Sequence, residues 1–67
     1  MIDYAAIGKR IQKKRQERSI TQEKLAEQVG ISVVYLSKIE NGRVYPTLDT
    51  LSNICTELDV ELAEVLS

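Results

Sequence analysis

The chain has 67 residues, a formal net charge of -1, one cysteine and no histidine. This length gives room for a single domain, residues 1–67, with a small core. No stretch has the apolar length of a membrane span or the pattern of a signal peptide, so we expect a cytoplasmic protein. An intramolecular disulfide is excluded, and the usual zinc-binding patterns have no histidine to supply ligands.

The first predicted element is a helix over about residues 4–18. Asp3 can cap its N-terminus, and Ile7 and Ile11 recur one turn apart on its inner face. Arg15 continues the same apolar stripe although it is charged. A charge on a buried face needs a partner of opposite sign.

Two short helices that meet at Gly30 are predicted next. Thr21 can cap the first helix, in which Leu25 and Val29 lie one turn apart on one face. Gly30 follows the last apolar position, where a left-handed backbone can end the helix and redirect the chain. Ser32 can then cap the second helix.

The second of these helices directs Leu36 and Ile39 toward the same core. It is expected to end at Asn41 and Gly42, since both residue types tolerate a positive φ. Two helices joined by so short a turn are typical of the helix-turn-helix, which lays its second helix in the major groove of DNA.

The outward face of the second helix carries small, apolar and basic side chains that suit a major groove, with Tyr35 toward the flank. Valine can contact a thymine methyl group, serine a base edge or a phosphate, and lysine the O6 and N7 atoms of guanine. The residues on this face are Ser32, Val33, Val34, Ser37 and Lys38. An alternative is that one valine packs under the turn and the other is a tolerated exposed residue.

After Gly42 we expect a loop over residues 43–46, because Pro46 favours an extended backbone before it, and then a helix capped by Thr47. The apolar stripe of that helix consists of Leu48, Leu51, Ile54, Cys55 and Leu58. Cys55 is expected to be a buried core thiol, with a redox or modification role as the alternative. Asp59 should end the helix. A last short helix should close the core with Leu62, Val65 and Leu66.

No alternating apolar pattern remains, so the sequence predicts an all-α, compact five-helix bundle. The basic and acidic residues are unevenly distributed along the chain. Seven basic residues precede Leu25, namely Lys9, Arg10, Lys13, Lys14, Arg15, Arg18 and Lys24, whereas every charge from Thr47 onward is acidic. A DNA-facing surface can therefore be positive despite the net charge, although the basic run could also be only a solvated helix face.

These motifs together resemble the phage repressor and Cro-type helix-turn-helix family, also called the xenobiotic-response-element family, with its lambda-repressor-like DNA-binding domains. The resemblance covers nearly the whole chain. It is carried by Thr21-Gln22, Leu25-Ala26, Val29-Gly30-Ile31-Ser32, Leu36 to Gly42, Pro46-Thr47-Leu48, Leu51, Ile54, Cys55, Leu58 and Val60.

The resemblance implies binding of double-stranded operator DNA, often as a homodimer with two-fold symmetry. It places Ser32, Val33, Val34 and Lys38 at base-reading positions. It places Gln22, Tyr35, Ser37, Asn41 and Arg43 near the phosphate backbone. Many relatives carry hydrogen-bonding side chains at the two valine positions, so thymine methyl groups, Lys38 and DNA shape are expected to carry more of the recognition here.

Arg15 and Glu40 match a pair that forms an internal ion pair in similar proteins. The sequence itself agrees, because each charge interrupts an otherwise apolar stripe. We expect this structural ion pair to orient the second helix of the motif.

The sequence therefore predicts a transcriptional regulator, most simply a repressor, that is encoded by a bacterium or a phage. The alternative is a protein-interaction module or the antitoxin of a toxin-antitoxin pair, with DNA binding secondary. The chain offers no catalytic constellation, so an enzyme is not expected. No cofactor, metal or small-molecule ligand is predicted, and neither is contact with a membrane.

Overall fold

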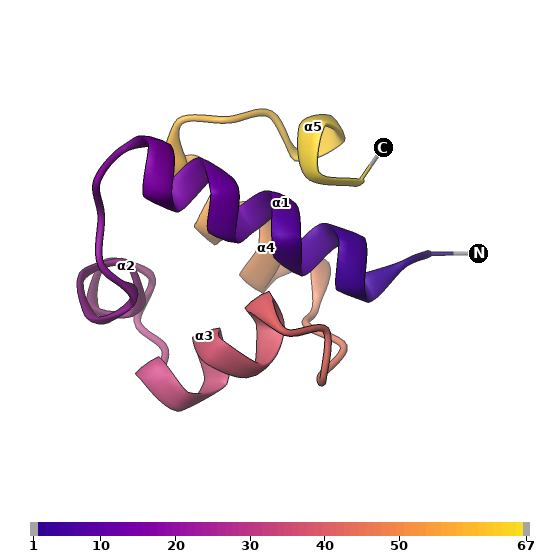
Figure 1. Cartoon of the computed structure of the whole chain (residues 1–67), viewed down its shortest axis with the longest axis horizontal. Helices are drawn as coiled ribbons and strands as arrows, with labels where there is room; N and C mark the ends of the chain where they lie inside the picture. Colours follow the sequence, from indigo (N-terminus) through magenta and orange to yellow (C-terminus); the bar gives the residue numbers. More distant parts are fainter. Residues whose placement is uncertain (1, 67) are drawn as a thin grey trace.

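The computed structural model describes residues 2–66 as five helices, and Figure 1 shows them wrapped around one core. The helices are α1 (Tyr4–Glu17), α2 (Gln22–Val29), α3 (Val33–Glu40), α4 (Leu48–Leu58) and α5 (Leu62–Leu66). No strand occurs within the described residues. The predicted all-α five-helix bundle is confirmed, with a helix-turn-helix at α2 and α3.

Four of the helices begin at the capping residues that the sequence predicted. The side-chain oxygens of Asp3, Thr21, Ser32 and Thr47 each accept a hydrogen bond from the backbone N–H three residues later, at 3.0–3.1 Å. Such a bond satisfies one of the free N–H groups in the first turn of a helix. The starts of α1 to α4 are therefore fixed by local chemistry.

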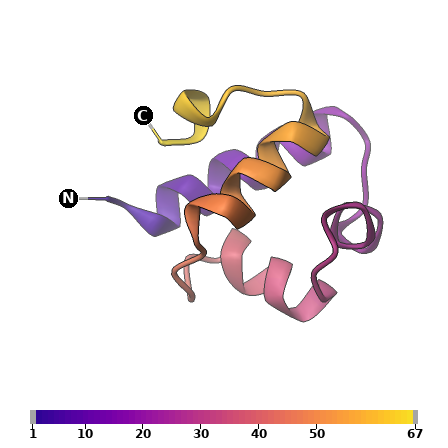
Figure 2. The same cartoon turned by 180° about the vertical axis from the view of Figure 1, so that it is seen from behind.

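The core lies where α1 crosses the other helices. Helix α1 packs against α3, α4 and α5, and α2 packs against α3 and α4. Figure 2 shows α4 running close to α1 while α3 remains on the outer side of the bundle. The buried apolar residues are Ile7, Ile11, Leu25, Ala26, Leu36, Ile39, Leu51, Ile54, Cys55, Leu58 and Val65.

The backbones of α1 and α3 approach each other closely near the end of α3. Gly42 has a φ of +69°, and a Cβ placed there would lie 2.7 Å from the Cα atom of Ala5. Only glycine combines this conformation with this contact. The loop after α3 is thereby held against the first turn of α1.

Several expected details differ in the structure. Helix α1 ends at Glu17, with Arg18 as its C-cap. Of Asn41 and Gly42, which both tolerate a positive φ, Gly42 adopts one at 69°, whereas the φ of Asn41 is -94°. Leu48 and Leu66 are 64% and 40% exposed instead of lying in the core. Both occupy helix ends, where the chain direction changes and a regular stripe no longer predicts burial.

Candidate nucleic-acid interface

The outer face of α3 forms one wall of a shallow open groove. The groove is lined by Gln22 at the start of α2, by four residues of α3 and by two residues that follow it: Gln22, Val33, Val34, Ser37, Lys38, Asn41 and Arg43. All seven belong to the nine residues that the sequence assigned to base or phosphate contacts. The structure thus brings most of the predicted site together on one surface.

The two remaining predicted residues lie beside the groove. Ser32 is exposed at the N-terminal end of α3, and its Oγ atom accepts a hydrogen bond from the backbone N–H of Tyr35 at 3.0 Å. Its hydroxyl hydrogen remains available to an outside acceptor. Tyr35 is half-buried and packs against the core, so only part of its side chain reaches the surface.

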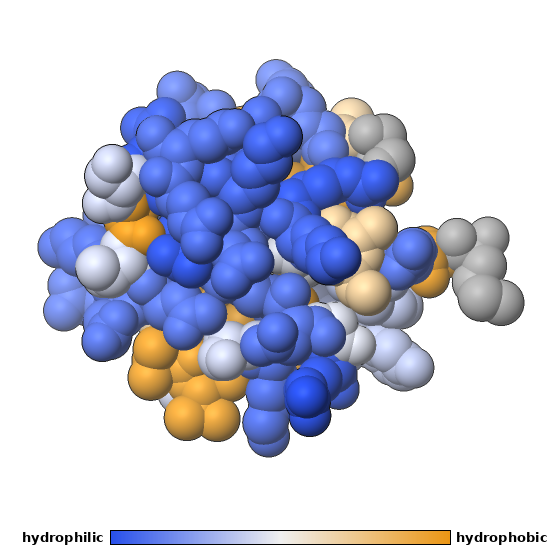
Figure 3. Space-filling view, viewed as in Figure 1, coloured by the Kyte–Doolittle hydropathy of each residue, from blue (hydrophilic) through white to orange (hydrophobic). Residues whose placement is uncertain are grey.

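An apolar patch lies at the beginning of α3. Val33 and Val34 are 38% and 61% exposed. Figure 3 shows the corresponding hydrophobic surface at the lower left, where α3 begins in Figure 1. The alternative that one valine packs under the turn does not describe this structure, since neither residue is buried.

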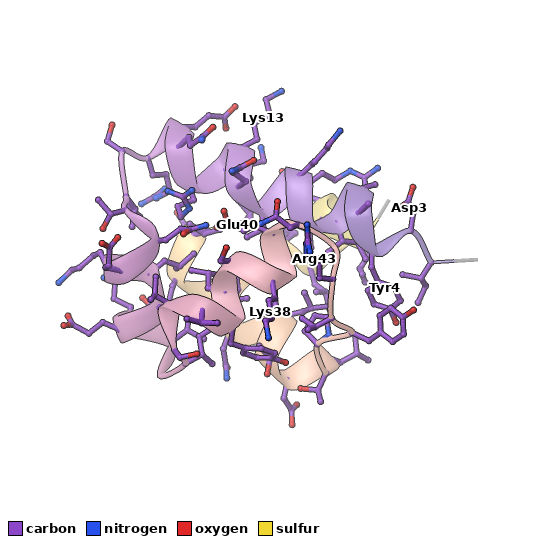
Figure 4. The ribbon with its side chains drawn as sticks, turned by 60° about the horizontal axis from the view of Figure 1, so that its bottom comes forward. Asp3, Tyr4, Lys13, Lys38, Glu40 and Arg43 are labelled. Atoms are coloured by element: carbon purple, nitrogen blue, oxygen red, sulfur yellow. The ribbon has the colours of Figure 1, made fainter. Side chains whose placement is uncertain are left out.

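The charged residues that line the groove are both cations. Lys38 and Arg43 are exposed, and Figure 4 shows both of them on the side of the molecule formed by α3 and the loop after it. Among residues 2–66, no carboxylate lines the groove. A surface of this kind attracts anions even though the chain as a whole is slightly acidic.

The basic residues of α1 do not line this groove, which fits the alternative that the basic run is not part of the DNA-facing surface. Arg10 donates a hydrogen bond to the carbonyl oxygen of Val65 at 3.1 Å, and Lys14 lies 4.0 Å from the carboxylate of Glu64. Lys13 points away from Lys38 in Figure 4. Arg10 and Lys14 therefore contact α5, whereas Lys9 and Lys13 are exposed to solvent.

A buried ion pair fixes the C-terminal end of α3 to α1. The Nε atom of Arg15 lies 2.8 Å from Oε2 of Glu40, and the Nη2 atom lies 3.2 Å from Oε1. Arg15 also donates to the carbonyl oxygen of Ile20 at 2.7 Å. The side chains of Arg15 and Glu40 are 10% and 1% exposed. Bidentate pairing compensates for removing both charges from water.

Gln22 connects this ion pair to the groove, which the sequence did not indicate. Its Nε2 atom donates to Oε1 of Glu40 at 2.9 Å, while the same side chain lines the groove beside Val33 and Ser37. An amide nitrogen carries two hydrogens, so Gln22 keeps one donor for an outside acceptor. Glu40 thereby sets the orientation of a residue on the candidate interface.

Asn41, which also lines the groove, is held against α3. Its Nδ2 atom donates to the backbone carbonyl oxygen of Ser37 at 2.8 Å and lies 3.5 Å from the Ser37 hydroxyl oxygen. These contacts restrain the Asn41 side chain and close the last turn of α3. Asn41 and Ser37 therefore present polar groups in a fixed arrangement.

Cys55 lies in the core, as expected, and is 3% exposed. Burial raises the pKa of its thiol above the ordinary value, and the negative charge of Glu64 raises that pKa further. Such a thiol stays protonated and unreactive at neutral pH. In residues 2–66 there is no cluster of three or more potential metal ligands, and no helix there is long and apolar enough to cross a bilayer.

The sequence from residue 11 to residue 65 matches the helix-turn-helix family model HTH_3. The chain belongs to this helix-turn-helix family. It is also similar to the ImmF control region 10 kDa protein of Bacillus phage phi105, with 40% identity over 62 residues that cover 92% of this chain and 69% of that protein. The immunity repressor protein of the same phage is 37% identical over 90% of this chain, which spans 42% of the repressor's length.

The fold is also similar to that of a regulator of known structure. The crystal structure of SinR, the master regulator for biofilm formation, in complex with DNA superimposes with a TM-score of 0.84. The sequence identity is 35%, and the alignment covers 91% of this chain and 98% of the SinR chain.

Proposed function

We propose that this protein is a sequence-specific regulator of transcription that binds double-stranded operator DNA with α3 in the major groove. The observation that carries the proposal is the groove on the outer face of α3, where the charged residues among the described lining are Lys38 and Arg43. Family membership and the similarity to SinR, which was solved with DNA, support the same assignment. The relatives include an immunity repressor protein of Bacillus phage phi105 and the HTH-type transcriptional regulator SinR of Bacillus licheniformis.

In this proposal the base edges are contacted by residues of the first two turns of α3. Ser32 donates its free hydroxyl hydrogen, Val33 and Val34 contact methyl groups, and Lys38 binds guanine O6 and N7. The recognition helix of a helix-turn-helix contacts bases with its N-terminal residues. The exposed position of these four residues supports that role.

The phosphate contacts surround these residues. Arg43 supplies a positive charge, and Gln22 offers an amide hydrogen at the N-terminus of α2, where a helix favours anions. Tyr35, Ser37 and Asn41 contribute neutral hydrogen-bonding groups. Phosphate contacts of this type fix the register of the protein on DNA without selecting a sequence.

We further propose that two copies bind DNA as a homodimer and that binding represses transcription. A two-fold dimer of helix-turn-helix domains contacts half-sites about one helical turn apart. The similarity to a phage immunity repressor supports repression. The proposed activity places the protein in the cytoplasm, together with the DNA.

Two experiments test this proposal. The first selects bound duplexes from a random pool, and the second measures the Kd of the selected duplex at several salt concentrations. We expect an enriched sequence with two related half-sites and an affinity that falls steeply as salt increases. The mass of the complex should correspond to two copies. Failure to enrich any sequence, or binding that does not respond to salt, would favour the protein-interaction module instead.

A further inference from the structure

Helix α3 begins with two adjacent exposed valines, neither of which belongs to the buried core. Val33 and Val34 are 38% and 61% exposed, and within the described part of the chain they are the apolar residues that line the groove. β-Branched residues are also weaker helix formers than alanine by a few tenths of a kcal/mol each, on the order of the measured propensities. These side chains are better explained by a contact that forms on binding.

On the basis of the proposed DNA-binding function, we propose that Val33 and Val34 form a binding site for the C5 methyl group of a pyrimidine. Thymine presents this methyl group in the major groove, next to its O4 acceptor. 5-Methylcytosine carries a methyl group on the same ring carbon. The protein therefore favours either methylated base at this position over uracil or unmethylated cytosine, and cytosine methylation of a site changes its affinity.

The position of the valines fits this role. They occupy the first turn of α3, the part of a recognition helix that meets base edges. The χ1 rotation of valine is restricted, so its methyl groups present a rigid surface that loses little entropy on contact. A flexible apolar side chain would bind a single methyl group less well.

Lys38 sets the distance between the two contacts along the DNA. It follows Val34 by one helical turn, which is about 6 Å along the helix axis. Successive base pairs are about 3.4 Å apart along the DNA axis, so this separation spans at most about two base-pair steps. The methyl-bearing pyrimidine should thus lie within about two base pairs of the guanine that Lys38 binds.

A DNA methyl group suits this patch better than an apolar surface of another protein. The patch consists of two side chains, and Lys38, Arg43 and polar groups surround it. A stable protein interface needs about 800 Å² from each partner. The cations of the groove complement phosphates on both sides of a base edge.

The test uses the selected operator duplex and removes one methyl group at a time, by replacing single thymines with uracil. For the unchanged protein we expect a loss of about fourfold in affinity at one or two positions per half-site, the factor that corresponds to about 0.8 kcal/mol for one buried carbon. At such a position, replacing the thymine–adenine pair with 5-methylcytosine–guanine should give a higher affinity than replacing it with unmodified cytosine–guanine. Fluorescence anisotropy measures each Kd.

The variant V33S/V34S should no longer distinguish thymine from uracil. Serine and valine have similar helix propensities, so α3 should remain folded, and circular dichroism checks this. The control is I2A, because Ile2 is similarly exposed, at 57%, but does not line the groove. I2A should retain the full difference between thymine and uracil.

The inference is overturned if every uracil substitution leaves the Kd of the unchanged protein within about 1.5-fold, far below the effect of one buried methyl group. It is also overturned if V33S/V34S retains the full methyl dependence. Either result would leave salt-dependent operator binding intact, so the two proposals fail separately. If no duplex sequence is enriched, the proposed function fails and this inference fails with it.

Discussion

At its C-terminal end, α3 is attached to the rest of the molecule through the buried carboxylate of Glu40, whereas at its N-terminal end Val33 and Val34 reach the surface. Glu40 contacts Arg15 of α1 and Gln22 of α2, and Arg15 also contacts the loop between those helices. The two ends of this short helix therefore have different roles. One end determines how α3 is oriented, and the other end is left free to contact a ligand.

The largest effect on stability should come from removing the ion pair at the C-terminal end of α3. Arg15→Ala leaves Glu40 as a buried charge without its cation, so the free energy of unfolding should fall by about 3–5 kcal/mol. Urea unfolding followed by circular dichroism measures this. Lys13→Ala, on the exposed side of the same helix, is the control and should change stability by less than about 0.5 kcal/mol.

A second variant keeps this prediction testable if Arg15→Ala does not fold. Replacing both charges, in R15M/E40L, removes the unpaired carboxylate and should recover much of the lost stability. If Arg15→Ala and Lys13→Ala proved equally stable, the ion pair would not hold α3 in place.

The next effect should appear on the exposed face of α3. Lys38→Ala should weaken binding to the selected operator by about 1–3 kcal/mol and relax the preference at one base pair. Its stability should stay within about 0.5 kcal/mol of the original, because the side chain is exposed. Lys13→Ala again serves as control. A uniform loss on all sequences would instead make Lys38 a phosphate contact.

Gln22 contacts Glu40 and also lines the groove, so its substitution should affect both stability and DNA affinity. Gln22→Ala removes the hydrogen bond to Glu40, so stability should decrease by about 1 kcal/mol, and DNA affinity should fall for every sequence. Gln28→Ala is the matched control, since Gln28 is exposed on the same helix and does not line the groove. A change in preference at a single base pair would contradict the phosphate role.

The smallest effect is expected at Arg43. Arg43→Ala should weaken binding to operator and random duplexes alike and reduce the slope of log K against log salt by about one unit per bound copy. Titrations of both duplexes at four or more salt concentrations measure the slope. An unchanged slope combined with altered base preference would exchange the roles of Arg43 and Lys38.

The sequence predicted those parts of the structure that depend on neighbouring residues. The caps at Asp3, Thr21, Ser32 and Thr47 were predictable because each contact spans three residues. The partnership of Arg15 and Glu40 was predictable for a different reason. Two opposite charges interrupt two apolar stripes, and burial then requires that they meet.

Contacts that depend on the orientation of whole helices were not predictable in this way. Gln22 is a polar residue at a helix start, and nothing in the local pattern indicates that it reaches Glu40, 18 positions later. Likewise, the sequence shows a basic α1 but not which side of that helix faces α5. The acidic end of the chain in fact lies beside it, as the contact between Lys14 and Glu64 shows.

Dimethyl sulfate footprinting on the selected operator tests the central claim most directly, because the reagent methylates guanine N7 in the major groove and adenine N3 in the minor groove. If α3 enters the major groove, bound protein should protect guanine N7 atoms in each half-site. Protection should disappear locally with Lys38→Ala. Protection of adenine N3 with all guanine N7 atoms still reactive would contradict the account.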